Sequence, residues 1–355
     1  MSELDKAALI KAVKGGEPVV QQRNLDGGDF NHADLAGGVF ESVSFRKADL
    51  RHANLKECNF IKCDFTGARL DHANLVLANM IEPVAEGASF QHCNLRMASF
   101  VDGQLSGSDF SNSDFNSTNF INPILVGGRF AGSKMEQASF INGDFSQADF
   151  TKVQVFRVNF LDPKVAGIRF EGARLELPFF MGADFSNYDF RKIDLIKPQF
   201  QKSLLVGTKF DDMDLTQAGF MEADMTGARF KRARLNQANM IKANLTQADF
   251  TKATMEQCLM QEACMVKVNL TGVKAMQALM VKADCTGAVF HHADLTYADF
   301  SHAVVAEADF SQTELYRANL HEVIEYKTIW HGANRSAALG TDKTKQKAEQ
   351  WQAVK

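Results

Sequence analysis

The residues best suited to carry out chemistry are four histidines that recur at one constant spacing: His32, His52, His72 and His92. Imidazole binds transition metals and changes its charge near neutral pH, so the series suggests either a metal site or a pH sensor. A constant spacing would stack the rings in a straight column, which is a poor tetrahedral cage, and no carboxylate or thiolate converges on them at a recognisable spacing. We therefore expect a solvated histidine ladder, with no metal and no cofactor.

Other reactive groups give no catalytic pattern. The six cysteines have no CxxC spacing and mostly occupy positions where small residues recur: Cys58, Cys63, Cys93, Cys258, Cys264 and Cys285. Reduced, packed thiols are the simplest interpretation, and they fit a cytoplasmic location. The chain has no GxSxG, P-loop, GxGxxG or HExxH motif. We expect no catalytic residues and no enzyme.

Composition limits the class of protein further. Of 355 residues, 45% are hydrophobic and 23% are charged, which is enough apolar material for a core. The net charge of -4 favours neither nucleic-acid binding nor strong polyanion character. No apolar run approaches the roughly 20 residues of a membrane span, and the first residues are charged and amphipathic, unlike a signal peptide. We expect a soluble, cytoplasmic protein.

One period of five organises the chain. We call every fifth residue from Leu25 to Leu320 a centre; the 60 centres are 27 Phe, 19 Leu, 8 Met, 3 Val, 2 Ala and 1 Cys. The residue two before a centre is often Ala, and the residue one before it is often Asp or Asn, as in Ala248-Asp249-Phe250. A period of five matches neither the helix nor the strand, so each unit must be a short extended side plus a corner.

This A-(D/N)-(L/F)-x-x pattern resembles the pentapeptide-repeat family over residues 20 to 325. The resemblance implies an all-β solenoid, a right-handed quadrilateral β-helix with four pentapeptides per coil and about 15 coils. Centres at positions divisible by 20, which we call the Phe/Met wall, carry Phe or Met from Phe40 to Phe300. Rings on this wall and the opposite one can interdigitate with smaller centres on the other two.

A solenoid needs caps at its ends. We expect three segments: an N-terminal capping helix in 1-20, the β-helix in 21-325, and a C-terminal cap and tail in 326-355. Ser2 is the predicted helix N-cap, and Gly15-Gly16 the predicted end. After Leu320 the register dissolves, and Val323, Ile324, Ile329 and Trp330 are expected to cover the last coil.

An apolar column is the best candidate for a binding surface. It follows the centres of the Phe/Met wall on the outside, and we call it the stripe: Ile61, Ile81, Val101, Ile121, Ile141, Leu161, Met181, Met221, Ile241 and Val281. An apolar stripe with a polar border marks an interface. The alternative is that β-branched residues simply suit an exposed strand and stack on one another.

The leading hypothesis is a non-enzymatic scaffold that binds a protein partner, or its own copy in a homodimer, through the stripe, with no nucleic acid or membrane bound. Two alternatives come from the resemblance. Family members with a short N-terminal helix resemble accessory or effector-linked components of bacterial type VI secretion. Others resemble duplex DNA and protect gyrase, but here basic residues balance the acids: Arg69, Arg129, Arg169, Arg174, Arg229 and Arg234.

Overall fold

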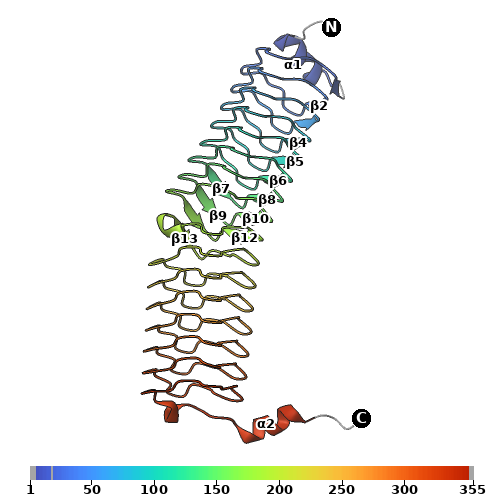
Figure 1. The fold of residues 1–355 in the computed structure, drawn as a ribbon. Helices are drawn as coiled ribbons and strands as arrows, with labels where there is room; N and C mark the ends of the chain where they lie inside the picture. The colour runs from blue at the N-terminus through green and yellow to red at the C-terminus, as the bar shows by residue number, and fades with distance from the viewer. Residues whose placement is uncertain (1–4, 17–18, 352–355) are drawn as a thin grey trace. The chain divides into compact units, whose positions relative to one another are not determined.

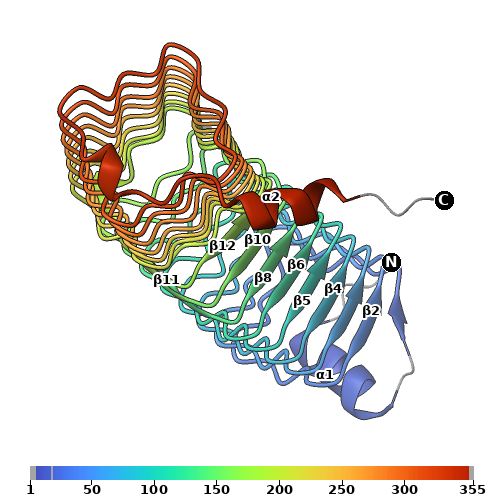
Figure 2. The ribbon, with the colours of Figure 1, turned by 90° about the horizontal axis from the view of Figure 1, so that it is seen from below.

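The computed structural model describes residues 5–16 and 19–351, which form two compact units. The first unit comprises the chain up to Asp184 together with Lys192–Asp194, and the second comprises Phe185–Arg191 and the chain from Leu195 onward. Within each unit the backbone winds in stacked coils (Figure 1). Figure 2 looks toward the C-terminal end of the second unit, whose coils overlay as nested outlines.

The N-terminal cap is the helix α1 (Lys6–Lys14). The predicted N-cap Ser2 lies outside the described residues, and the side chain of Asp5 caps the helix by accepting a hydrogen bond from the Ala8 N–H. At the other end the N–H of Gly15 donates to the carbonyl of Lys11 at 2.7 Å. Leu9 is fully buried, so the apolar side of α1 packs inward.

Parallel backbone pairing joins each coil to the next at a constant step of four pentapeptide units. Phe60 pairs with Met80, and the same step recurs along the chain up to the bridge between Asn319 and Leu339. The step confirms a β-helix in which four five-residue units complete one coil. Because every strand is parallel to the next, corresponding side chains lie directly above one another.

The Phe/Met wall of the first unit is a nine-stranded sheet of order β1-β2-β3-β4-β5-β6-β8-β10-β12. Its strands are β1 (Val20–Gln21), β2 (Val39–Glu41), β3 (Asn59–Ile61), β4 (Asn79–Ile81), β5 (Ser99–Val101), β6 (Asn119–Ile121), β8 (Ser139–Ile141), β10 (Asn159–Leu161) and β12 (Phe179–Met181). A four-stranded sheet, β13-β11-β9-β7, contains β7 (Lys134–Glu136), β9 (Gln154–Phe156), β11 (Arg174–Glu176) and β13 (Asp194–Ile196).

The coils of the predicted stack are not all alike. Nine of them carry a regular strand on the Phe/Met wall, and those of the second unit pair through isolated bridges. The difference arises after the centre. In the first unit that residue remains extended, whereas at Gln201, Met221 and Ile241 it begins a turn.

Stacked phenylalanine rings fill the core of each unit. Successive rings on one wall lie face to face, as in Phe100 and Phe120 with centroids 4.6 Å apart. Rings on different walls meet edge to face, as in Phe110 and Phe120 at 6.0 Å and 89°. Where Ser or Thr replaces the inward Ala, its hydroxyl donates to a backbone carbonyl, as Ser113 does to Phe90 at 2.7 Å.

Each corner has two backbone devices that explain the repeat. The Asp or Asn before a centre accepts a hydrogen bond from the N–H two residues on, as Asp64 does from Thr66 at 2.8 Å. The second corner residue has a positive φ, for example 56° at His32. Its N–H donates to the next coil, here to the Arg51 carbonyl at 2.9 Å, so stacking offsets the strain of that conformation.

Pairing between coils continues beyond residue 325, the predicted end of the β-helix, through Leu339. The prediction that the register ends at Leu320 is wrong because the step persists while the residues at the centres change to Glu325, Trp330, Arg335 and Gly340. Trp330 stacks on Phe310 at 4.4 Å and covers the core as expected. Ile324 and Ile329 do not, since they are 58% and 49% exposed.

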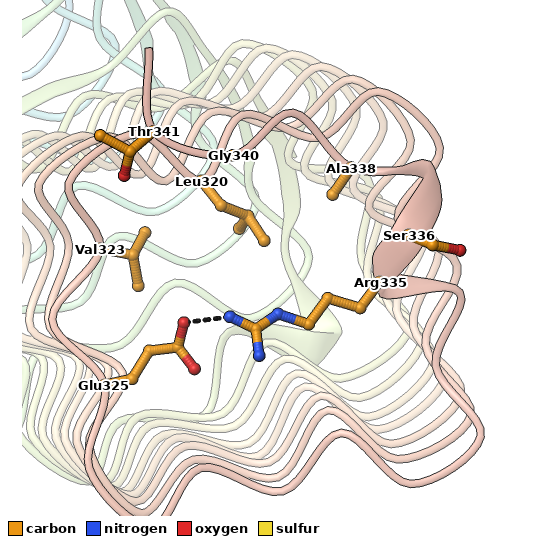
Figure 3. A pocket seen from close by; sticks show the side chains of 8 residues that line it. All are labelled: Leu320, Val323, Glu325, Arg335, Ser336, Ala338, Gly340 and Thr341. Atoms are coloured by element: carbon orange, nitrogen blue, oxygen red, sulfur yellow. Dashed lines mark hydrogen bonds and ion pairs between the residues drawn. The ribbon is translucent and has the colours of Figure 1, made fainter. Parts of the chain in front are cut away.

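A hollow of about 220 Å³ lies at this end of the second unit. Its apolar lining includes Leu320 and Val323, and Glu325 and Arg335 form an ion pair across it (Figure 3). Gly340, also in the lining, stands one step after Leu320, where earlier coils have an apolar centre. The absence of a side chain at Gly340 leaves this space unfilled.

The remaining elements are two 3-10 turns, η1 (Phe190–Lys192) and η2 (Arg335–Ala337), and the C-terminal helix α2 (Lys343–Gln350). Asp342 caps α2, accepting from the N–H groups of Thr344 and Lys345. No helix among the described residues is both long and apolar enough to cross a membrane.

Arginine–aspartate pairs link successive coils on the outside. All six arginines that balance the acids pair with an aspartate, four of them with the aspartate at the same place in the preceding coil: Arg69 with Asp49, Arg129 with Asp109, Arg169 with Asp149 and Arg234 with Asp214. Arg174 pairs with Asp194 and Arg229 with Asp211. The pairs neutralise acids one by one, so no continuous acidic face forms along these columns.

Filling the hollow should stabilise the end of the second unit. An added Cβ at Gly340 meets no atom within 4 Å, so Gly340→Leu should extend the column above Leu320 and raise the free energy of unfolding by about 1 kcal/mol. Urea unfolding and amide exchange of the last coil would measure this. His331→Leu, which places leucine at an exposed corner of the same coil, is the control and should give no gain; equal effects of both would contradict the assignment.

Acid should remove the stability contributed by Asp49. Hydrogen bonds from Arg51 lower the pKa of Asp49 from 3.8 to about 2, so the ionised form favours folding above pH 4 and this contribution disappears as the pH falls toward 2. The gap in unfolding free energy between wild type and Asp49→Asn should shrink by about 1 kcal/mol, after allowance for solvent screening, between pH 5 and pH 2. A gap that does not vary with pH would refute this.

Candidate interaction surface

In the first unit the stripe is one continuous column. Ile61, Ile81, Val101, Ile121, Ile141, Leu161 and Met181 close seven successive strands, β3 to β12, of the Phe/Met wall. Each pairs in register with the next, as Ile121 does with Ile141. All seven are half-buried because each side chain covers part of its neighbours, while the adjoining centres are fully buried. The structure thus places the stripe residues on the outside of the wall.

Polar side chains border this column on both sides and bond largely to one another. Before the centres, the Asn79 amide donates to Asn59 at 3.2 Å. After the stripe, the Asn122 amide donates to Asp102 at 2.9 Å, and Asn142 donates to Asn122. Because these amides already have hydrogen-bond partners in the protein, the border loses few hydrogen bonds when water is excluded from it. An apolar strip with such a border suits the apolar face of a protein.

In the second unit the stripe is interrupted. Met221, Ile241 and Val281 are half-buried at its positions, while Gln201 precedes Met221 and Gln261 lies between Ile241 and Val281. The side-chain oxygens of both glutamines are buried without a hydrogen-bond partner. Lys202 pairs with Glu222, and Lys242 with Glu262, along the border. This part of the stripe is therefore less apolar than that of the first unit.

At the end of the second unit the chain covers the same column itself. Ser301 and His321 occupy stripe positions and are only 3% and 2% exposed. Glu349 of α2 contacts His321 here, with its Oε2 3.0 Å from Nε2. A side chain of α2 therefore reaches the stripe position of the last coil.

The histidine ladder stacks as the sequence predicts. Ring centroids are 4.7 Å apart for His32 and His52, 4.9 Å for His52 and His72, and 4.8 Å for His72 and His92, with interplanar angles of 7° or less. Nitrogens around one tetrahedral ion lie about 3.3 Å apart. Because the stacked rings are parallel, their equivalent nitrogens point in the same direction and do not converge on one ion.

The cysteines are packed thiols. All six are free, and five are buried. Burial raises the pKa of Cys58 to about 12 and that of Cys63 to about 11. A thiol with so high a pKa is a weak nucleophile near neutral pH, which agrees with a structural role.

Two other exposed apolar groups were missed by the sequence reasoning, which considered only the residue after each centre. Leu77 and Met97 are 45% and 57% exposed at second corner positions of adjacent coils. In the last coils Tyr297 and Tyr316 meet edge to face at 5.8 Å, and Arg317 lies over the Tyr297 ring. The available signal was that three of the four tyrosines fall between residues 297 and 326.

Two family models match the sequence. One, described as a pentapeptide repeat region, matches residues 53–130. The other, described as pentapeptide repeats (8 copies), matches residues 24–60, 113–151, 199–237, 238–274 and 283–321. Together they cover more than half of the chain. No curated protein matches it.

Solved structures of repeat proteins are similar to parts or most of the chain. QnrB1, a plasmid-mediated fluoroquinolone resistance protein, is 22% identical over 53% of this chain and 86% of its own, with a TM-score of 0.38. HetL, a pentapeptide repeat protein involved in heterocyst differentiation regulation in the cyanobacterium Nostoc, is 16% identical over 96% and 98%, with a TM-score of 0.26. These superpositions are weak, whereas the sequence models match repeat by repeat. The chain belongs to the pentapeptide-repeat family.

Proposed function

We propose that the protein is a non-enzymatic scaffold whose first unit binds a protein partner, or a second copy of the chain, through the stripe. The observation that carries this proposal is the run of seven apolar side chains on adjacent strands, from Ile61 to Met181, between polar columns whose groups are largely satisfied. A partner that covers the column desolvates few unpaired polar groups, so burial of the apolar side chains is the main gain.

Strand formation explains only part of the pattern. Extended backbone favours Ile and Val at these positions in the first unit, but Ile241 and Val281 recur in the second unit where the backbone turns. The preference for an apolar residue after the centre therefore persists without a strand. The arginine–aspartate pairs weigh against a DNA-mimic role, because such a role needs a strongly acidic surface.

Lysines in the stripe should leave the fold intact and abolish its binding. The variant Ile81→Lys, Ile121→Lys, Ile141→Lys should keep the far-UV circular dichroism of the wild type, because these side chains point outward. In sedimentation equilibrium any wild-type dimer should become a monomer. The control, Gln91→Lys, Ala131→Lys, Thr151→Lys, changes the residue after the centre on the opposite wall and should behave as wild type. An unfolded stripe variant would overturn the assignment of these residues to the outside.

Photo-crosslinking in the organism of origin tests binding to a partner whose identity is open. With p-benzoylphenylalanine at Ile121, we expect a defined adduct to the chain itself or to another protein. The same group at Thr151, on the opposite wall, should give none. Absence of an adduct at Ile121, or equal labelling at both positions, would refute the proposed binding surface.

A further inference from the structure

We propose that His302, His321 and Glu349 form a site for one Zn²⁺ ion that fastens the C-terminal helix α2 to the β-helix. The proposal does not depend on the proposed function. Glu349 Oε2 lies 3.0 Å from His321 Nε2 and 3.5 Å from His302 Nε2, and the three ligand atoms lie within 4.8 Å of one another. A tetrahedral zinc ion with bonds of about 2.0–2.1 Å separates its ligands by about 3.3 Å, so the distances from Glu349 to both histidines already fit, and the two histidine nitrogens must move closer together.

The three residues come from two parts of the second unit. His302 and His321 stand on successive coils of the Phe/Met wall, where their rings meet edge to face with centroids 5.3 Å apart. Glu349 reaches them from the last turn of α2. The site contrasts with the histidine ladder, because its rings are perpendicular and a carboxylate converges on both.

The donor set selects a transition metal. Two imidazole nitrogens and one carboxylate oxygen suit zinc, whereas magnesium and calcium prefer all-oxygen sites. His321 is nearly fully buried and hence held in place, while His302 and Glu349 are about one-third exposed. Water has access from that side and can supply the fourth ligand.

The helix needs such an attachment. α2 has eight residues and none of them is buried, and so short a helix is not stable alone in water. Besides Glu349, the side chain of Gln346 in α2 contacts the coils through a hydrogen bond to Glu322 at 2.7 Å. Lys345 approaches the other carboxylate oxygen of Glu349 at 3.6 Å, which leaves Oε2 to the imidazoles.

The hydrogen bonds of His321 show what metal binding must change. The Asp342 N–H points at Nδ1 at 3.2 Å, so Nδ1 accepts and Nε2 carries the proton that it donates to Glu349. When zinc binds Nε2, the ring proton moves to Nδ1 and the bond from Asp342 breaks. Zinc should therefore shift the amide signal of Asp342, where α2 begins, as well as the signals of the ligands.

Titration of metal-free full-length protein with zinc chloride tests the site. Calorimetry at pH 7.4 should show one ion per chain. His302→Ala and Glu349→Gln change partly exposed side chains, so they should fold, and each should weaken binding about tenfold or more. His331→Ala, in the last coil, and His72→Ala, in the ladder, should bind zinc as the wild type does. No saturable binding, or equal weakening by either control, would overturn the proposal.

Trypsin cleavage within α2 gives a second readout. Lys343, Lys345 and Lys347 are exposed cleavage sites. Zinc should slow cleavage there several-fold in the wild type and have no effect in Glu349→Gln. Calorimetric binding without protection of α2 would refute its role in fastening the helix.

Discussion

Backbone hydrogen bonding between successive coils, always in the same register, is the constraint on which the rest of the structure depends. Each coil is too short to bury its own centres, and its corner residues adopt the left-handed region at a cost. The next coil offsets both, since it accepts the corner N–H groups and places a ring face to face with the one before, as with Phe100 and Phe120. A period that slipped by one residue would turn every centre outward, which explains why the register runs without an insertion.

The same constraint decides where function can lie. Inward positions are committed to packing, and the Asp or Asn before each centre is committed to its corner. Chemistry is left to the corner residues, which the four-unit step gathers into columns. A column of identical side chains makes a strip, such as the stripe or the histidine ladder, and a strip suits an extended protein contact better than a metal ion or a reaction centre.

The sequence predicted the fold to the level of its walls because inward residues obey the period strictly. It predicted the stripe because that column is also periodic. The prediction failed after Leu320, where the centres are no longer regularly apolar but backbone pairing continues through Leu339. The pairing step is set by backbone hydrogen bonds and persists when the side chains change. The sequence also could not find His302, His321 and Glu349, because neither spacing is a multiple of the period and α2 must fold back to bring Glu349 near.

The last coil shows how one register can both continue a fold and end it. Glu325 and Arg335 occupy opposite centres and pair across the core, and Trp330 closes over Phe310 while its indole N–H donates to Glu325 at 3.1 Å. Charges at inward positions discourage a further coil, or another chain, from stacking there, because it would bury them. The chain then leaves the repeated coils through Gly340, and α2, which no longer follows the five-residue period, brings the carboxylate of Glu349 to a histidine of the coils.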